Sequence, residues 1–196
     1  MAKAILVCNT IRFETRFHAI EQEDVMKVSD FVGTWTITSA HETEGEAFFP
    51  EDFDDETDEN IDFLEWLNET PTLTKTRGDE VTGVTLIITE GGDFTETAEE
   101  NTSLPCFDEE GVMEMTATPF DGELVEMNGA FFLRPKDLDE WVSPDDDRYE
   151  VVVRYDDGDT IVCDHIELQG DVLYRTVSVS TDLIYFNRIF YTYERA

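Results

Sequence analysis

One stretch decides the fold: Val28-Ser29-Asp30-Phe31-Val32-Gly33-Thr34-Trp35-Thr36-Ile37-Thr38. From Gly33 onward it has the alternating pattern of a β-strand. A glycine lets the backbone pass close under a large ring, and Trp35 is large enough to fill the end of a barrel. The stretch therefore predicts a first strand over residues 33–42 whose tryptophan closes one end of a β-barrel.

Alternation along this strand places Trp35, Ile37 and Ser39 on one face. The rest of the chain fits antiparallel strands joined by Gly- and Asp-rich turns. We expect these strands over residues 72–77, 81–89, 94–98, 112–118, 123–127, 130–133, 148–155, 160–168, 172–180 and 183–193. Exposed strand edges invite aggregation, so we expect closure into a barrel, with a β-sandwich as the alternative.

Length and patterning predict one barrel domain over residues 31–196, preceded by an N-terminal extension of added strands or a cover over residues 1–30. An acidic loop is expected over residues 42–59, and an amphipathic helix over residues 60–69. Residues 134–144 read as a loop with a helical turn.

The charge is the most unusual property of the sequence, since 47 acidic and 13 basic residues give a net charge of −34. Hydrophobic residues at 40% still supply a core, so we expect a folded protein. The acidity fits surface hydration, including adaptation to high salt, or an acidic surface that imitates nucleic acid or engages a basic protein partner. Direct nucleic-acid binding is not expected, because phosphates would be repelled.

Cys8, Cys106 and Cys163 are widely spaced and have no metal-binding pattern, which indicates buried thiols in a reducing compartment. The apolar run near the N-terminus is too short for a secretion signal, and no stretch is long enough for membrane insertion. We therefore expect a cytoplasmic location.

The stretch Phe31-Val32-Gly33-Thr34-Trp35 resembles the opening of the intracellular fatty-acid-binding proteins and, more loosely, of lipocalin-type β-barrels. The segment Asn60-Ile61-Asp62-Phe63-Leu64-Glu65-Trp66-Leu67 is similar to the helical lid of that family, and Tyr193-Glu194-Arg195-Ala196 to its closing residues. The resemblance implies an all-β, antiparallel up-and-down β-barrel, lipocalin-like, with a short helical lid.

The same resemblance implies an internal ligand site on the last strand. That family carries Arg-x-Tyr there, whereas this chain has Tyr191-Thr192-Tyr193, so the tyrosine matches and the arginine is missing. A buried carboxylate needs a compensating cation or several donors, and Arg175 and Arg154 are the other internal cations that could serve. The missing arginine argues against a fatty acid and leaves a neutral or aromatic lipophile as a ligand. The candidate ligand-binding residues are Tyr193, Tyr191, Arg175, Arg154, Trp66 and Phe63, and the candidate barrel-closing residues are Gly33, Trp35 and Arg188. The arginine that stacks on Trp35 could be Arg188 or Arg195.

Tyr191 and Tyr193 share one strand face with Ile189, where they either line a cavity or are ordinary half-buried aromatics. Cys163 and His165 also share a face, but they lack further metal ligands in the sequence. No hydrolase, metalloprotease or phosphate-loop motif is present, so nothing indicates an enzyme, a metal site or a cofactor other than a bound lipophilic molecule.

These observations predict a binding or carrier protein for a small lipophilic ligand in a β-barrel cavity. The alternative is a strongly acidic interaction module on the same barrel, for a basic protein partner or as a nucleic-acid mimic. The first hypothesis requires an open cavity, and the second requires acidic residues clustered on one face.

Overall fold

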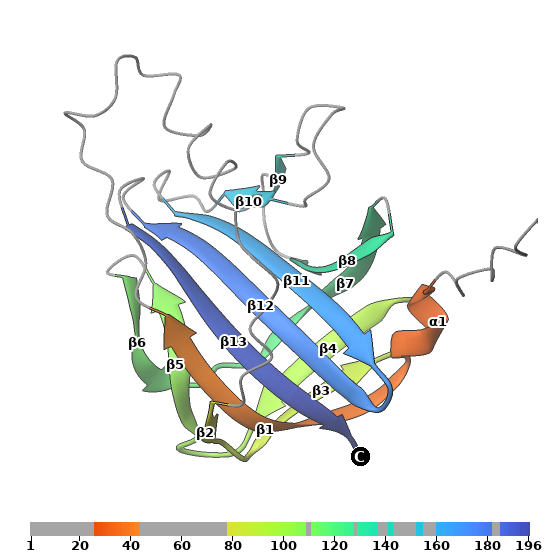
Figure 1. Ribbon diagram of the computed structural model, residues 1–196, viewed down its shortest axis with the longest axis horizontal. Coiled ribbons are helices and arrows are strands. Elements are labelled where there is room, and N and C mark those ends of the chain that lie inside the picture. Colours follow the sequence, from red (N-terminus) through yellow and green to blue (C-terminus); the bar gives the residue numbers. More distant parts are fainter. Residues whose placement is uncertain are drawn as a thin grey trace, which may run out of the picture.

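The computed structural model describes residues 26–43, 78–108, 111–127, 129–136, 141–142, 152–154, 160–181 and 185–196. Their elements, in chain order (Figure 1), are α1 (Val28–Phe31), β1 (Gly33–Thr43), β2 (Asp79–Glu80), β3 (Val84–Ile88), β4 (Asp93–Ala98), β5 (Ser103–Asp108), β6 (Gly111–Thr116), β7 (Phe120–Met127), β8 (Ala130–Pro135), β9 (Trp141–Val142), β10 (Val152–Arg154), β11 (Ile161–Gln169), β12 (Val172–Thr181) and β13 (Tyr185–Arg195). The all-β class predicted from the alternating pattern is confirmed. No helix among these elements is long and apolar enough to cross a membrane.

Backbone hydrogen bonds close the sheet into a barrel. The strand order around it is β1-β3-β4-β7-β8-β11-β12-β13, and β13 pairs with β1. Neighbouring strands are antiparallel throughout. This is a closed up-and-down barrel of eight strands, so the lipocalin-like fold is confirmed over a sandwich.

Further short strands in the described part of the chain lie outside the barrel. β2 pairs with β1, while β10 and β9 continue the sheet from β11. β5 and β6 form a separate two-stranded sheet that contacts β1 and β13 (Figure 1), and we call this unit the β5–β6 hairpin. The sequence pattern predicted β6 but missed β5, which contains Pro105. Proline is tolerated there because β5 is an edge strand.

A β-bulge in β1 changes which residues face the barrel interior. Ile37 pairs with Tyr193, the register shifts between Ile37 and Ser39, and Ala40 then pairs with Tyr191. Residues paired across antiparallel strands share a face, so Ala40 lies with Ile37 and the two tyrosines. The prediction that Ser39 shares a face with Trp35 is therefore wrong, because one extra residue reverses the alternation.

The barrel is closed at the end where β1 begins. Trp35 is fully buried, and its indole Nε1 donates a hydrogen bond of 2.8 Å to the carbonyl oxygen of Phe31 in α1. The guanidinium of Arg195 lies 4.2 Å above the Trp35 ring and donates to the carbonyl oxygens of Val32 at 2.8 Å and Asp30 at 3.1 Å. Backbone acceptors and one cation thus hold α1 across this end.

Arg188 lies far from this closure. It pairs with Thr43 at the other end of β1, and its Nε donates to Ser178 Oγ at 3.2 Å. The cation that stacks on Trp35 is therefore Arg195, seven positions further along β13. Register decides between the two arginines, because Trp35 pairs directly with Arg195.

The loop with a helical turn expected over residues 134–144 is wrong at its two ends, because residues 134–135 end β8 while Trp141 and Val142 form strand β9, with Trp141 paired to Val153. Pairing with β10 satisfies backbone groups that a helical turn would satisfy locally. The expected lid helix at 60–69, the strand at 72–77, residues 44–59 of the acidic loop and residues 1–25 of the extension lie outside the described residues.

Replacing Gly33 should destabilise the closed end. Gly33 has φ of +148°, and a Cβ there would lie 2.6 Å from Arg195 Nη1. We expect Gly33→Ala to lower the free energy of unfolding by about 2 kcal/mol in urea denaturation. Gly91→Ala is the control, since its Cβ would meet nothing closer than 3.7 Å. Equal effects of the two substitutions would contradict this account of the closure.

Candidate ligand-binding cavity

A cavity of about 240 Å³ lies between the inner wall of the barrel and the β5–β6 hairpin. Its wall is largely apolar and aromatic, and its charged groups are gathered around Arg175. It is lined by Glu96, Leu104, Cys106, Phe107, Ala117, Thr118, Phe120, Leu133, Pro135, Val162, Asp164, Arg175, Val177 and Tyr191. A mainly apolar wall with a small number of polar groups is typical of small-molecule sites.

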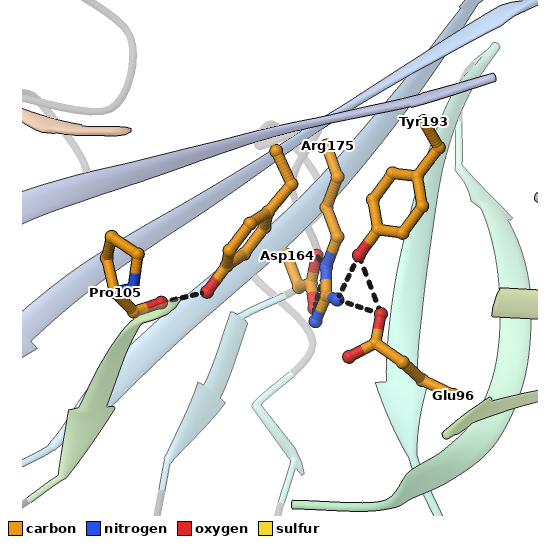
Figure 2. A network of polar contacts seen from close by, with 6 residues as sticks. Glu96, Pro105, Asp164, Arg175 and Tyr193 are labelled. Atoms are coloured by element: carbon orange, nitrogen blue, oxygen red, sulfur yellow. Dashed lines mark hydrogen bonds and ion pairs between the residues drawn. The ribbon is translucent and has the colours of Figure 1, made fainter. Parts of the chain in front are cut away.

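Strand register brings the polar residues together. Arg175 of β12 pairs directly with Tyr191 of β13. On the other side of β12, Arg175 pairs with Ile166 and Val177 pairs with Asp164, so Asp164 is the diagonal neighbour of Arg175 on the same face. Glu96 reaches the group from β4, across the barrel interior (Figure 2).

Arg175 is the centre of this group. Its Nε donates to Asp164 Oδ1 at 2.9 Å, and its Nη2 donates to Asp164 Oδ2 at 2.7 Å, which is the two-pronged geometry of a strong arginine–carboxylate pair. Its Nη1 donates to Glu96 Oε2 at 2.8 Å (Figure 2). One guanidinium therefore ties β12 to β11 and to β4.

Tyr193 completes the network from β13. Its hydroxyl donates to Glu96 Oε2 at 2.7 Å and lies 3.4 Å from Arg175 Nη1. Burial, and after it the charge of Glu96, raises the pKa of Tyr193 well above its ordinary value. The phenol stays protonated at neutral pH and acts as a donor to Glu96.

Burial governs the electrostatics of the charged members. Asp164 and Arg175 each expose 7% of their surface, and the Glu96 side chain exposes 13%. Burial raises the pKa of Asp164, and Arg175 opposes this shift. Burial would lower the pKa of Arg175, but Asp164 and Glu96 outweigh it and raise the pKa well above its ordinary value. Arg175 is thus a permanent cation held by two carboxylates.

Aromatic rings flank the guanidinium and connect it to the hairpin. Arg175 Cζ lies 5.4 Å from the Phe120 ring centroid and 5.2 Å from that of Tyr191. The Tyr191 hydroxyl donates to the carbonyl oxygen of Pro105 in β5 at 2.5 Å (Figure 2). Leu104, the neighbouring residue, is buried in the barrel core. The β5–β6 hairpin is therefore attached to the barrel at the cavity itself.

Three of the predicted binding residues, Tyr193, Tyr191 and Arg175, meet in this network. Arg154 lies in β10, where the structure describes the backbone, while Phe63 and Trp66 lie outside the described residues.

Asp164 and Glu96 were not singled out from the sequence, although the signal was present. Each occupies an inward-facing position of its strand. Asp164 lies between Val162 and Ile166 in β11, and Glu96 lies between Phe94 and Ala98 in β4.

Cys163 and His165 lie on the outer face of β11, away from the cavity. The described residues contain no group of His, Cys, Asp and Glu side chains arranged to hold a metal ion. His165 instead packs against Phe132, with ring centroids 5.4 Å apart.

Comparisons with known proteins give limited matches. No family model matches the chain, and no curated protein matches it in sequence. Among solved structures, it is similar to fatty-acid-binding protein 1 of Echinococcus granulosus, at 16% identity, covering 86% of this chain and 98% of that chain with a TM-score of 0.35. It is also similar to a secretory abundant heat soluble protein of Ramazzottius varieornatus, at 12% identity, covering 85% of this chain and 95% of that chain with a TM-score of 0.35. Strand pairing defines the fold, and neither likeness identifies a ligand.

Removing the central cation should destabilise the barrel in a pH-dependent way. Arg175→Met leaves two buried carboxylates without their partner, which we expect to lower the free energy of unfolding by about 3–5 kcal/mol. Without Arg175, nothing opposes the raised pKa of Asp164 in the folded state. The folded form then binds more protons than the unfolded form, so stability should rise as pH falls toward that pKa.

Urea denaturation of Arg175→Met at several pH values tests this expectation. Combining Arg175→Met with Asp164→Asn and Glu96→Gln should restore much of the lost stability, because the uncompensated charges are gone. If Arg175→Met alone is as stable as the parent protein at every pH, the network contributes nothing to folding.

The tyrosine that binds the hairpin should control its local opening. Tyr191→Phe removes the hydrogen bond to Pro105, and we expect a loss of about 1 kcal/mol together with faster amide exchange confined to the β5–β6 hairpin. Tyr193→Phe is the matched control. It also removes a hydroxyl from this strand face, but that hydroxyl donates to Glu96 and not to the hairpin. Hydrogen exchange followed by mass spectrometry should show hairpin opening in the first variant and not in the second.

Proposed function

We propose that the protein binds a small lipophilic ligand in the cavity between the barrel wall and the β5–β6 hairpin. The observation that carries the proposal is the cavity of about 240 Å³ in a barrel that is closed by Trp35 at one end. Ligand pockets commonly have volumes of about 300–1,000 Å³, so this cavity favours a compact ligand, such as a ring with a short side chain.

Apolar burial supplies the driving force for such binding. Phe107, Phe120, Leu133, Val162 and Val177 face the space, and each square ångström of apolar ligand surface removed from water contributes roughly 25 cal/mol. The polar network lies in the same wall and gives the site a place for one polar group of the ligand. An apolar body with a single polar group is the molecule that this wall accommodates best.

Extraction of the purified protein with organic solvent, followed by mass spectrometry, should identify any lipophile that copurifies with it. Titration with an environment-sensitive fluorescent lipophile then gives an affinity, and displacement of the probe gives the affinities of unlabelled compounds. A protein that neither copurifies with a lipophile nor takes up the probe would contradict the proposal.

A cavity-filling substitution locates the site. Ala117 lines the cavity, and Ala117→Phe should weaken probe binding at least about tenfold because the new ring occupies ligand volume. Thr116→Phe is the matched control, since it adds a phenylalanine at the neighbouring exposed position. We expect it to change probe affinity less than about twofold. Equal weakening by both variants would place the probe outside the cavity.

A further inference from the structure

We propose that the ligand of this cavity presents a cationic hydrogen-bond donor, such as a primary amine, to Glu96, and that a carboxylate is excluded. The inference rests on the proposed function and concerns the polar group of the ligand. Two features of the described part of the wall support it: its charge balance and one carboxylate oxygen that accepts no hydrogen bond there.

Among the described residues that line the cavity, the charge balance is negative. Glu96, Asp164 and Arg175 all line the cavity, which gives two carboxylates for one guanidinium. All three nitrogens of Arg175 already donate to these carboxylates, through Nε and Nη2 to Asp164 and through Nη1 to Glu96. A ligand carboxylate would bring a third negative charge to a buried guanidinium that already holds two carboxylates, which is unfavourable.

Glu96 is the carboxylate available to a ligand. Asp164 uses both of its oxygens on Arg175. Glu96 instead accepts from Arg175 and Tyr193 through the same atom, Oε2, and its Oε1 has no hydrogen-bond donor among the described residues (Figure 2). Oε1 therefore offers a site for an N–H group.

A cationic donor fits this site better than a neutral one. An ammonium group on Oε1 would bring the wall to two cations and two carboxylates. Arg175 opposes its approach, but Asp164 already neutralises Arg175 through paired contacts, so the charge of Glu96 remains to be balanced.

Three compounds that share a phenethyl body test the charge preference. Phenethylamine, phenethyl alcohol and phenylacetate differ mainly in the polar group, and each is measured by displacement of the fluorescent lipophile. We expect the amine to bind most tightly and the acid at least about tenfold more weakly, since a nearby carboxylate favours a cation by this factor or more. The order should persist in high salt, because buried pairs are screened far less than the acidic surface.

Glu96→Gln tests whether Glu96 is the source of the preference. This variant should reduce the ratio of the amine affinity to the acid affinity by about tenfold. The affinity for phenethyl alcohol should change by less than about twofold. Glu126→Gln is the matched control, because it removes the same charge from an exposed position of β7 and should leave the ratio unchanged. Thermal melting of both variants confirms that they are folded.

The outcomes separate this inference from the proposed function. Equal binding of the three compounds to the parent protein would overturn the cationic preference and leave the lipophile site in place. An amine preference that vanishes in high salt, or falls equally in Glu126→Gln, would assign it to the acidic surface and overturn the inference. Failure of every compound and of the probe to bind would contradict the proposed function itself. The parent-protein series decides the question even if Glu96→Gln does not fold.

Discussion

The barrel depends on one buried ion pair network, in which Arg175 is shared by Asp164 and Glu96. Removing charged groups from water is costly, and the attraction between them offsets that cost only when every partner is in place. The network therefore favours the strand register that brings β4, β11 and β12 to the same point, with Tyr193 added from β13. Buried polar networks of this kind can make one arrangement of a core more favourable than its competitors. The cavity lies beside the network and takes its shape from the same register.

Arg195 and Arg175 stabilise the barrel in different ways. At the closed end, Arg195 covers the Trp35 ring and donates to backbone carbonyls of the segment around α1, so its partners are dipoles and a π-system. In the cavity wall, Arg175 has carboxylate partners and flanking rings. The first arrangement adds no net negative charge and only closes the barrel. In the second, two carboxylates share one guanidinium, and within the described part of the chain Oε1 of Glu96 has no donor.

The sequence predicted much of the fold and part of the site. Alternation located most of the barrel strands, and it placed Tyr191 and Tyr193 on one face because the pairing of β13 with β12 is unbroken between them. Predictions failed where a single residue changed the alternation or where a partner was remote. The bulge after Ile37 reversed the facing of Ser39, and register alone chose Arg195 over Arg188. Asp164 and Glu96 stood at inward positions, but in a chain with 47 acidic residues the more general expectation for a carboxylate is solvent.

The position of the β5–β6 hairpin in the chain has an evolutionary consequence. β4 and β7 are hydrogen-bonded neighbours in the barrel, so the residues between them form an insertion that leaves the barrel ladder unbroken. Such an insertion can lengthen, shorten or change its sequence while the scaffold keeps its geometry. The hairpin supplies the side of the cavity that includes Leu104 and Phe107, whereas the charged network belongs to the barrel. The size of the cavity and the charge of its wall are thereby encoded in separate segments, and each can diverge under selection without the other.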